Sequence, residues 1–318
     1  MSAERQALGG HLAALASMLC FGLMSPMCKV AMQGGVLDGL RLATLRVSGA
    51  ALLFGVLALG RPRERVALRD LPKLFLMSLC GMSINQFCYV CGVSYTSPTN
   101  GCVVATSTPI FTLLLAAMFL HFRVTRRRAL GMGLAALGAL VLILGSCRTG
   151  GLSGDPRGDA LCLLAQFAAA CYFVFFSELL HRYSPITMMK WLFGFSAALM
   201  LPCMLPHLLA APWGELSMSA GAGAAYVVVG GSFVSYLLLM MAQQRLDAPT
   251  VATYNYVQPV VAASVGVGLG VDVLTGQKVF AVLLIGAGVW MVTHARASGR
   301  RRLLRLLRRW HRRIAGSD

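Results

Sequence analysis

The stretch "PIFTLLLAAMFLHFRVTRRRALGMGLAALG" at residues 109–138 aligns without a gap on "PVVAASVGVGLGVDVLTGQKVFAVLLIGAG" at residues 259–288. Both copies begin with a proline, and Pro109 and Pro259 are 150 residues apart. Self-similarity at a fixed spacing is the signature of an internal repeat. The sequence therefore predicts two related units that follow one another along the chain.

The repeat sets the expected domain organisation. Thr125 and Thr275 keep the offset of 150, and so do Gly81 and Gly231. A polar, glycine-rich stretch between the copies is typical of a loop. The expected parts are a first unit at 10–147, a linker at 148–158, a second unit at 159–296 and a tail at 297–318.

The composition indicates a membrane protein. The chain has 318 residues with a mean hydropathy of +0.71, and 57% of them are hydrophobic while 12% are charged. A helix needs about 20 apolar residues to cross the hydrocarbon layer of a bilayer. Ten segments meet this requirement approximately: 12–32, 39–60, 71–92, 100–120, 129–147, 159–180, 187–209, 220–243, 249–270 and 275–295.

Each unit would hold five of these segments, and an odd number has a topological consequence. The second unit must enter the membrane from the side opposite to the first, so the repeats are inverted. The predicted fold class is an all-α integral membrane protein with ten transmembrane helices in two inverted five-helix repeats. In many transporters this arrangement places the substrate site near the bilayer midplane, where the units face each other.

The basic residues predict the orientation. A formal net charge of +17 would suggest a nucleic-acid partner in a soluble protein, but here most of the 28 Lys and Arg residues fall on one side of the predicted spans. Such asymmetry marks the cytoplasmic side. We therefore expect a multi-pass protein of the cytoplasmic (inner) membrane with both termini in the cytoplasm. The exceptions to the asymmetry are Lys29, Arg41, Arg46, Arg148, Arg157 and Lys278.

The tail carries the sequence "RRRLLRLLRRWHRRI" at 300–314. Its apolar residues share one helical stripe surrounded by arginines, which is typical of an amphipathic helix on an anionic membrane surface. A disordered basic tail is the alternative. The expected partners are thus a small-molecule solute and the bilayer, with anionic lipids at the tail; no nucleic acid is expected, and a homodimer stays open.

The cysteine and histidine residues do not indicate a redox, catalytic or metal site. Cys88 and Cys91 form a C-x-x-C pair, but no second pair or histidine lies near it in sequence, so packing in the core is favoured. The six histidines lie near span ends without metal-ligand spacing. We expect no catalytic residue, no metal and no cofactor.

The paired prolines fall about ten residues into the fourth and ninth segments. Proline lacks the backbone donor of a helix interior, so Pro109 would free the carbonyl of Ala105, and Pro259 that of Asn255. Inside a bilayer, such carbonyls need protein or water to bind them.

Polar side chains surround the second proline. At about 100° per residue, Tyr254, Asn255 and Gln258 share one arc of the ninth segment, while Tyr256 points away from it. This arc could line a solute cavity, which we favour, or it could only bond neighbouring helices.

Other uncharged polar residues extend the candidate cavity. Their amides, hydroxyls and rings suit a small polar or amphipathic organic solute. The full set of cavity candidates is Asn85, Gln86, Tyr89, Ser107, Pro109, Gln166, Tyr172, Ser235, Tyr236, Tyr254, Asn255, Gln258 and Pro259.

Two charged residues are candidates as well. Arg46 lies about seven residues into the second segment, and an intramembrane charge is a functional candidate by default. With Lys29 it could attract a substrate carboxylate, or its long stem could carry the charge to the membrane surface. Of the acids, only Glu178 falls inside a span, near its cytoplasmic end, so the sequence does not support proton coupling through a buried carboxylate.

With these motifs in view, the chain resembles the drug/metabolite transporter superfamily, in its EamA-type ten-span branch. The resemblance covers about residues 10–296 and implies an alternating-access carrier, often an exporter, for amino acids, amines, nucleobases or drugs. The family often has an acid before the threonine of the repeat; Asp272 matches it, but Phe122 replaces it in the first copy. The stretches that carry the resemblance are "FGLMSPMCKVAM", "LATLRVSGAALL", "SYTSPTNGCVVATSTPIFTLLLAAMFL" and "LDAPTVATYNYVQPVVAASVGVGLGVDVLTGQKVFAVLLIGAGVWMV".

Three functions stay in competition. A carrier of small organic solutes through a central cavity is favoured by the inverted repeat and its paired prolines. An intramembrane enzyme would need a catalytic pair or metal triad at membrane depth, and the sequence presents none. A structural membrane protein would use its polar residues only to hold helices together.

Overall fold

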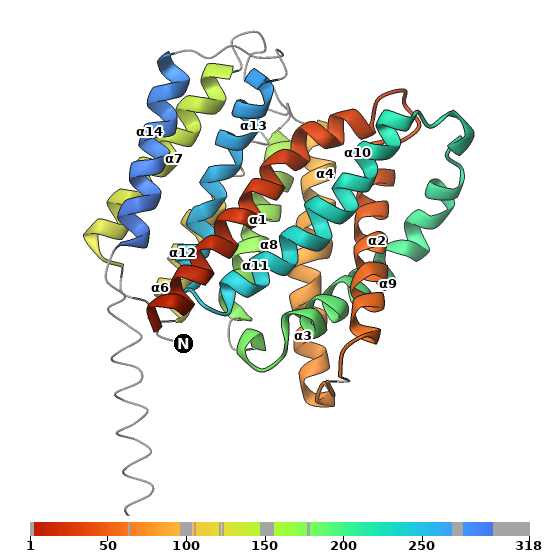
Figure 1. Cartoon of the computed structure of the whole chain (residues 1–318), viewed down its shortest axis with the longest axis horizontal. Helices are drawn as coiled ribbons and strands as arrows, with labels where there is room; N and C mark the ends of the chain where they lie inside the picture. Colours follow the sequence, from red (N-terminus) through yellow and green to blue (C-terminus); the bar gives the residue numbers. More distant parts are fainter. Residues whose placement is uncertain are drawn as a thin grey trace, which may run out of the picture.

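The computed structural model describes residues 3–62, 64–95, 104, 106–120, 122, 124–146, 156–176, 179–268 and 276–294, and throughout them every regular element is helical (Figure 1). The expectation of an all-helical chain is confirmed for these residues. In the first half the elements are α1 (Ala3–Ala31), α2 (Gly39–Leu59), η1 (Leu68–Asp70), α3 (Leu71–Ser78), η2 (Leu79–Ile84), α4 (Asn85–Tyr95), α6 (Thr108–Phe119) and α7 (Arg126–Ser146). In the second half they are α8 (Pro156–Phe175), η3 (Leu179–His181), α9 (Pro185–Leu209), η4 (Trp213–Glu215), α10 (Met218–Val228), η5 (Val229–Val234), α11 (Ser235–Gln243), α12 (Ala248–Thr253), η6 (Tyr254–Tyr256), α13 (Val257–Gly268) and α14 (Gly276–Thr293).

Local sequence explains where several helices begin. A short polar side chain at the N-cap accepts a hydrogen bond from a free backbone N–H of the first turn. The capping residues are Asp38 for α2, Ser184 for α9, Ser217 for α10 and Asp247 for α12.

Five helical stretches in the described part of the chain are long and apolar enough to cross a membrane: Arg5–Met24, Gly39–Leu59, Pro156–Phe175, Pro185–Leu209 and Met218–Gln243. Shorter apolar helices cover Thr108–Phe119 and Val279–Thr293. The number of ten crossings stays a prediction.

The two units share a distortion at the same place. α3 passes into α4 through the π-helical turn η2, and α10 passes into α11 through the π-helical turn η5. η2 and η5 begin at Leu79 and Val229, which are 150 residues apart. A π-turn holds an extra residue, so side chains beyond it rotate around the helix relative to an unbroken α-helix, and such turns are frequent at functional sites. The side chains at the start of α4 in the first unit and of α11 in the second are therefore rotated around their helices in the same way.

Helices of one unit pack against their counterparts in the other. α7 lies along α14, as Figure 1 shows at one edge of the molecule, and the two run antiparallel. A Cβ atom on Gly131 would touch Met291, whereas one on Gly138 would touch Ala281. Moving forward along α7 thus means moving backward along α14.

The second pair of counterparts, α2 and α9, is antiparallel as well. Arg41 near the start of α2 bonds His207 near the end of α9, while Phe54 further along α2 stacks on Phe193, which precedes His207. The remaining helices pack across the units in the same symmetric way. In the first unit α4 and α6 pack on α8 of the second, and their counterparts α11 and α13 pack on α1, the counterpart of α8. An approximate two-fold axis perpendicular to these helices accounts for all of these contacts.

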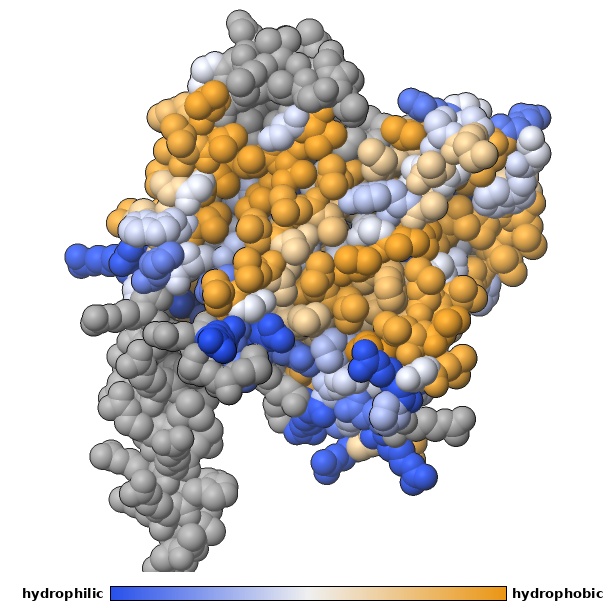
Figure 2. All heavy atoms as spheres, in the orientation of Figure 1, coloured by the Kyte–Doolittle hydropathy of each residue, from blue (hydrophilic) through white to orange (hydrophobic). Residues whose placement is uncertain are grey.

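The outside of the bundle is apolar. Figure 2 shows an almost continuous hydrophobic face between hydrophilic ends, over the described residues of this view. Large apolar residues are left exposed on several helices, which in water would be a liability but in lipid costs nothing. They include Leu52, Val56, Met118, Leu137, Phe280, Leu283 and Trp290.

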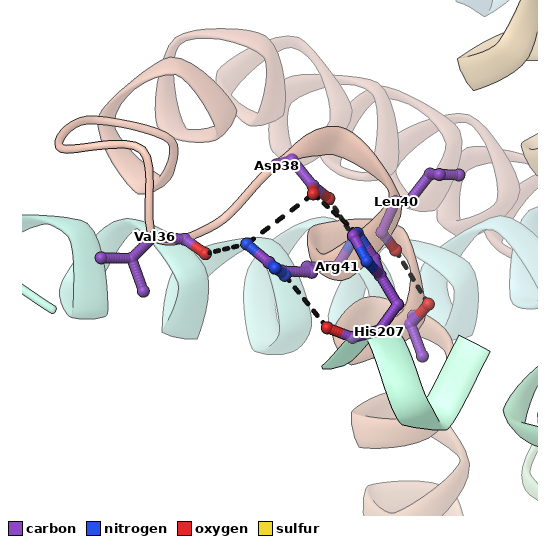
Figure 3. A network of polar contacts seen from close by, with 6 residues as sticks. Val36, Asp38, Leu40, Arg41 and His207 are labelled. Atoms are coloured by element: carbon purple, nitrogen blue, oxygen red, sulfur yellow. Dashed lines mark hydrogen bonds and ion pairs between the residues drawn. The ribbon is translucent and has the colours of Figure 1, made fainter. Parts of the chain in front are cut away.

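A polar network joins α2 to α9 at the end of the bundle opposite the N-terminus (Figure 3). The Asp38 carboxylate accepts hydrogen bonds from the backbone N–H of Arg41 at 2.8 Å and from His207 Nε2 at 2.7 Å. The Arg41 guanidinium donates to the carbonyl oxygens of His207 at 3.1 Å and Val36 at 2.9 Å. This network, the α2–α9 latch, holds the two units together at that end.

Ion pairs hold the opposite end, where the chain begins. Arg128 Nη2 of α7 lies 3.1 Å from Asp247 Oδ2, the capping residue of α12. The Tyr183 hydroxyl donates to Asp70 Oδ2 at 2.7 Å, and Arg182 lies 3.4 Å from the same carboxylate. At both ends of the bundle the two units are therefore joined by polar contacts.

Two sequence expectations need correction. The fourth segment is not a single helix with a proline in mid-span, because a turn at 106–107 precedes α6 and Pro109 is the second residue of that helix. The ninth segment stays helical from Ala248 to Gly268 with Pro259 in its middle, but the turn η6 just before the proline divides it into α12 and α13. Proline is tolerated in a first helical turn, where a backbone donor has no intrahelical partner anyway. Tyr254–Tyr256 form the tight 3₁₀ turn η6, so the rotation per residue there is about 120° and not about 100°.

Some expectations lie outside the described residues: the linker at 148–155, the tail from 295 onward, Glu178 and Asp272, and the side chains of Lys29 and Cys91.

Candidate functional site

The centre of the candidate site is a hydrogen bond between repeat counterparts. Gln86 Nε2 donates to the Tyr236 hydroxyl at 3.2 Å, and the two residues are 150 positions apart. Each lies just after its π-turn, Gln86 on α4 and Tyr236 on α11. Two counterparts related by a two-fold axis can touch only close to that axis. This contact therefore marks the place where the two units meet.

Arg46 reaches the same place from α2. Its Nε donates to Ser232 Oγ of η5 at 2.7 Å, and its Nη1 donates to Gln86 Oε1 at 2.9 Å. The guanidinium carbon also lies 5.9 Å from the centre of the Tyr236 ring, within the range of a cation–π contact. The charge thus points into the bundle, and the alternative of a side chain stretched to the membrane surface is wrong. We call Arg46, Gln86, Ser232 and Tyr236 the central cluster.

Aromatic rings border the central cluster. Phe21 of α1 and Phe193 of α9 both meet the Tyr236 ring edge-on, with centroids 5.1 and 5.2 Å away. Phe54 stacks on Phe193 at 5.5 Å and contacts Phe233 at 4.6 Å. The polar groups of the cluster are therefore surrounded largely by aromatic side chains, as is usual for sites that bind small organic molecules.

The other unit holds the corresponding junction without a charge. The counterpart of Arg46 is Ser196 on α9, and its hydroxyl lies 3.0 Å from that of Ser83 in η2. Both junctions tie one unit's second helix to the other unit's π-turn. Each half has a polar contact at this position, and in one half that contact is neutral.

A second contact between counterparts lies near the broken segments. The Tyr256 hydroxyl donates to the carbonyl of Thr106 at 3.3 Å, again across 150 residues. The Tyr256 side chain is buried against Ala135, Ala281 and Ile285 of α7 and α14. Tyr254 instead belongs to the main core, so the two tyrosines point in different directions, as the sequence suggests.

The polar residues around η6 bond α1. The Tyr254 hydroxyl lies 2.9 Å from His11 Nδ1, and Gln258 Nε2 lies 3.2 Å from Met18 Sδ and 3.4 Å from Asn255 Oδ1. Sequence reasoning missed His11 because it sits near the beginning of a span, and nothing local connects it to a residue 243 positions away.

Several other candidates bond neighbouring helices. Asn85 Nδ2 donates to the carbonyl of Ala165 on α8 at 2.8 Å. Thr108 Oγ1, absent from the predicted set, donates to Gln166 Oε1 at 2.6 Å, and the Tyr172 hydroxyl donates to Gln243 Oε1 at 3.2 Å. These contacts suit helix–helix adhesion, and Asn85 Oδ1 also lies 3.4 Å from Gln86 Nε2 of the central cluster.

Three candidates remain to be placed. Tyr89 lies on α4, one turn after Asn85 and half-buried. The hydroxyls of Ser107 and Ser235 are buried with no hydrogen-bond partner in the described part of the chain. Buried polar atoms of this kind are uncommon in native proteins and suggest a ligand, water or another conformation.

No metal centre arises from the residues whose placement is described, since they contain no group of three or more His, Cys, Asp or Glu suited to a metal ion.

Comparison with known proteins gives a consistent result. The family model described as "EamA-like transporter family" matches twice, at residues 8–144 and 156–294. An uncharacterized transporter of Archaeoglobus fulgidus is 28% identical over 261 residues, covering 82% of this chain and 90% of the relative. A probable terminal-alkyne amino-acid exporter of Streptantibioticus cattleyicolor is 27% identical, covering 87% and 90%, and the uncharacterized inner membrane transporter YedA of Escherichia coli is 27% identical, covering 79% and 83%.

One solved crystal structure has the same fold. It superposes with a TM-score of 0.75 at 18% identity and covers 89% of this chain and 96% of its own.

Proposed function

Since this chain belongs to the EamA-like transporter family over both of its repeats, we propose that it is a secondary carrier of small organic solutes which works by alternating access between the two units. The central cluster carries the proposal, because it joins a charge and polar groups from both units at the approximate two-fold axis. A site there can be exposed to one side or the other as the units rock against each other.

The ends of the bundle support the alternating mechanism. The α2–α9 latch joins the units at one end, and the Arg128–Asp247 pair contributes at the other. A rocking motion of the two units can break these contacts at one end while those at the other end stay formed. A carrier can alternate between its two open forms by such a motion.

We further propose ten crossings in two inverted repeats. The antiparallel packing of α7 on α14 and of α2 on α9 supports this, because inverted repeats require counterparts to run in opposite directions. The clustering of Lys and Arg at the N-terminal end supports a cytoplasmic position for both termini.

Export is the proposed direction. One relative covered over most of its length is named a probable amino-acid exporter, which supports amino acids or related metabolites as the class to test first.

The test is solute flux in liposomes that contain the purified protein, measured with a panel of labelled amino acids, amines and drugs. Tyr236→Phe removes the hydroxyl that Gln86 binds, so the flux of an accepted solute should fall severalfold while the fold survives. Tyr226→Phe is a matched control, because this tyrosine donates to the carbonyl of Cys20 and, in the described part of the chain, makes no hydrogen bond with a member of the central cluster. The proposal would be overturned if no solute crossed faster than it crosses protein-free liposomes. An equal loss of flux in both variants would mean that the solute site lies outside the central cluster.

A further inference from the structure

We propose that the solute is an organic carboxylate with an apolar or aromatic body, bound through Arg46, and that amines without a carboxylate are rejected. This inference rests on the proposed function, because it names the class of solute for that same central site.

The first reason is that the charge of Arg46 has no counter-ion among the side chains that the structure describes. A guanidinium is a cation, and Arg46 is half-buried, so its charge loses part of its hydration and an anion beside it would be favourable. No carboxylate of the described residues forms an ion pair with Arg46. The described acids have other positions: Asp38 in the α2–α9 latch, Glu64 on Ser184, Asp70 on Tyr183, Glu215 in η4 and Asp247 on Arg128.

The second reason is the direction of the hydrogen bonds. Ser232 Oγ donates to the carbonyl of Val227 at 2.9 Å and accepts from Arg46 Nε, so its proton is used. Gln86 accepts from Arg46 through Oε1 and therefore presents its amide to Tyr236 at 3.2 Å. The Tyr236 oxygen accepts that bond, which leaves its own O–H proton to donate elsewhere.

The unused groups of the central cluster are consequently donors. Two of the guanidinium's donors are engaged by Ser232 and Gln86, and a guanidinium has about five N–H groups in a planar fork. Together with the Tyr236 hydroxyl, the remaining N–H groups favour a ligand that brings oxygens and negative charge. A carboxylate matches the fork and gains charge-assisted bonds, whereas an ammonium group would meet a like charge.

The third reason is that the fold does not require this charge. Ser196 and Ser83 make the equivalent link in the other half at 3.0 Å with neutral hydroxyls. A half-buried cation at only one of the two corresponding junctions points to a functional role.

The surroundings indicate the rest of the solute. The Tyr236 ring, with Phe21 and Phe193 edge-on to it at 5.1 and 5.2 Å, offers apolar and aromatic contact next to the charge. Rings prefer such tilted arrangements and add favourable contact for an aromatic or aliphatic body.

The experiment compares four probes of one skeleton on the purified full chain: 3-phenylpropionate, phenylalanine, phenethylamine and 3-phenylpropionamide. The readout is the shift in thermal midpoint in detergent, since a ligand that binds only the folded state raises it. The two carboxylates should raise the midpoint of the wild type in a concentration-dependent way, and the amine and the amide should not.

Variants then locate the effect. Arg46→Ser copies the neutral junction of the other half and should weaken carboxylate binding at least about tenfold, whereas Arg46→Lys keeps the charge without the fork and should be intermediate. Arg127→Ser removes an arginine that lies over the Trp290 ring, outside both the central cluster and the α2–α9 latch, and should leave the shift intact.

Three results would overturn the inference: an amine or amide shift as large as that of the acids, a carboxylate shift that survives in Arg46→Ser, or no shift with any probe. The comparison of probes on the wild type remains decisive if the variants do not fold. In each case the proposed function is judged separately, by whether any solute of the labelled panel crosses protein-bearing liposomes.

Discussion

Replacing Gly288 by alanine tests the packing of the two repeats at the approximate two-fold axis. A Cβ atom at this position would lie 2.5 Å from the carbonyl oxygen of Gly131 and 2.6 Å from the backbone nitrogen of Ala135. These are backbone atoms, which cannot rotate away. Alanine at 288 therefore forces α7 and α14 apart.

The size of the effect follows from that separation. Relieving the overlap needs a gap of about 0.5–1 Å, which forfeits roughly a quarter to a half of each dispersion contact across the interface. Overpacking of this kind costs about 1–3 kcal/mol of unfolding free energy. The whole of this cost should appear as a lower unfolding free energy, because close packing of small residues holds membrane helices together in lipid or detergent.

The control is Gly286→Ala in the same helix, where a Cβ atom would meet nothing within 4 Å. It gains the same helix propensity, up to about 1 kcal/mol, without the clash. Unfolding in mixed micelles by increasing sodium dodecyl sulfate, followed by circular dichroism or tryptophan fluorescence, gives both free energies. Equal effects of the two substitutions would refute the close approach of α7 and α14.

Three further predictions concern the ends of the bundle. Burial alone would raise the pKa of Asp38, but the hydrogen bonds from the Arg41 N–H and the His207 ring outweigh it and hold the pKa below its ordinary value. The Asp38 carboxylate therefore contributes to stability above about pH 4, and this contribution is lost as the pH falls through the lower pKa of the folded state. Asp38→Asn should accordingly lower the thermal midpoint at neutral pH and converge with the wild type in acid, and a pH-independent difference would contradict this. The pKa of Asp70 is lowered chiefly by the Tyr183 hydroxyl, so Tyr183→Phe should raise the pH at which acid destabilises the protein, as measured by thermal midpoints over the same range. Arg128→Met should cost about 1–3 kcal/mol, less than a fully buried pair because Asp247 is 30% exposed, and a double-mutant cycle with Asp247→Asn should show coupling; additive losses would mean that the pair is incidental.

Part of the candidate site was predictable from the sequence. A charge or an amide in an apolar segment is conspicuous because burying it is costly, and Arg46, Gln86 and Tyr236 stand out for this reason. Ser232 was visible but did not stand out, since a serine is ordinary in a membrane helix. His11 was missed because its partner Tyr254 lies far away in the chain.

The local backbone at the site was less predictable. The π-turns η2 and η5 and the 3₁₀ turn η6 change the direction of every side chain that follows them. A helical wheel assumes a constant rotation per residue, so at these places it gives side-chain directions only approximately, although the separation of Tyr254 from Tyr256 agrees with it.

The sequence by itself determined the helical class, the membrane environment and the division into two related units, because apolar length and an offset of 150 residues can be read without a fold. Only the tertiary structure decided which polar residues meet. The contacts of Gln86 with Tyr236 and of Thr106 with Tyr256 join positions 150 apart, and they exist because a two-fold relation brings counterparts together at its axis. The neighbours of Arg46 were decided in the same way, because the sequence fixes neither how the two units dock nor which partner a guanidinium finds at the contact.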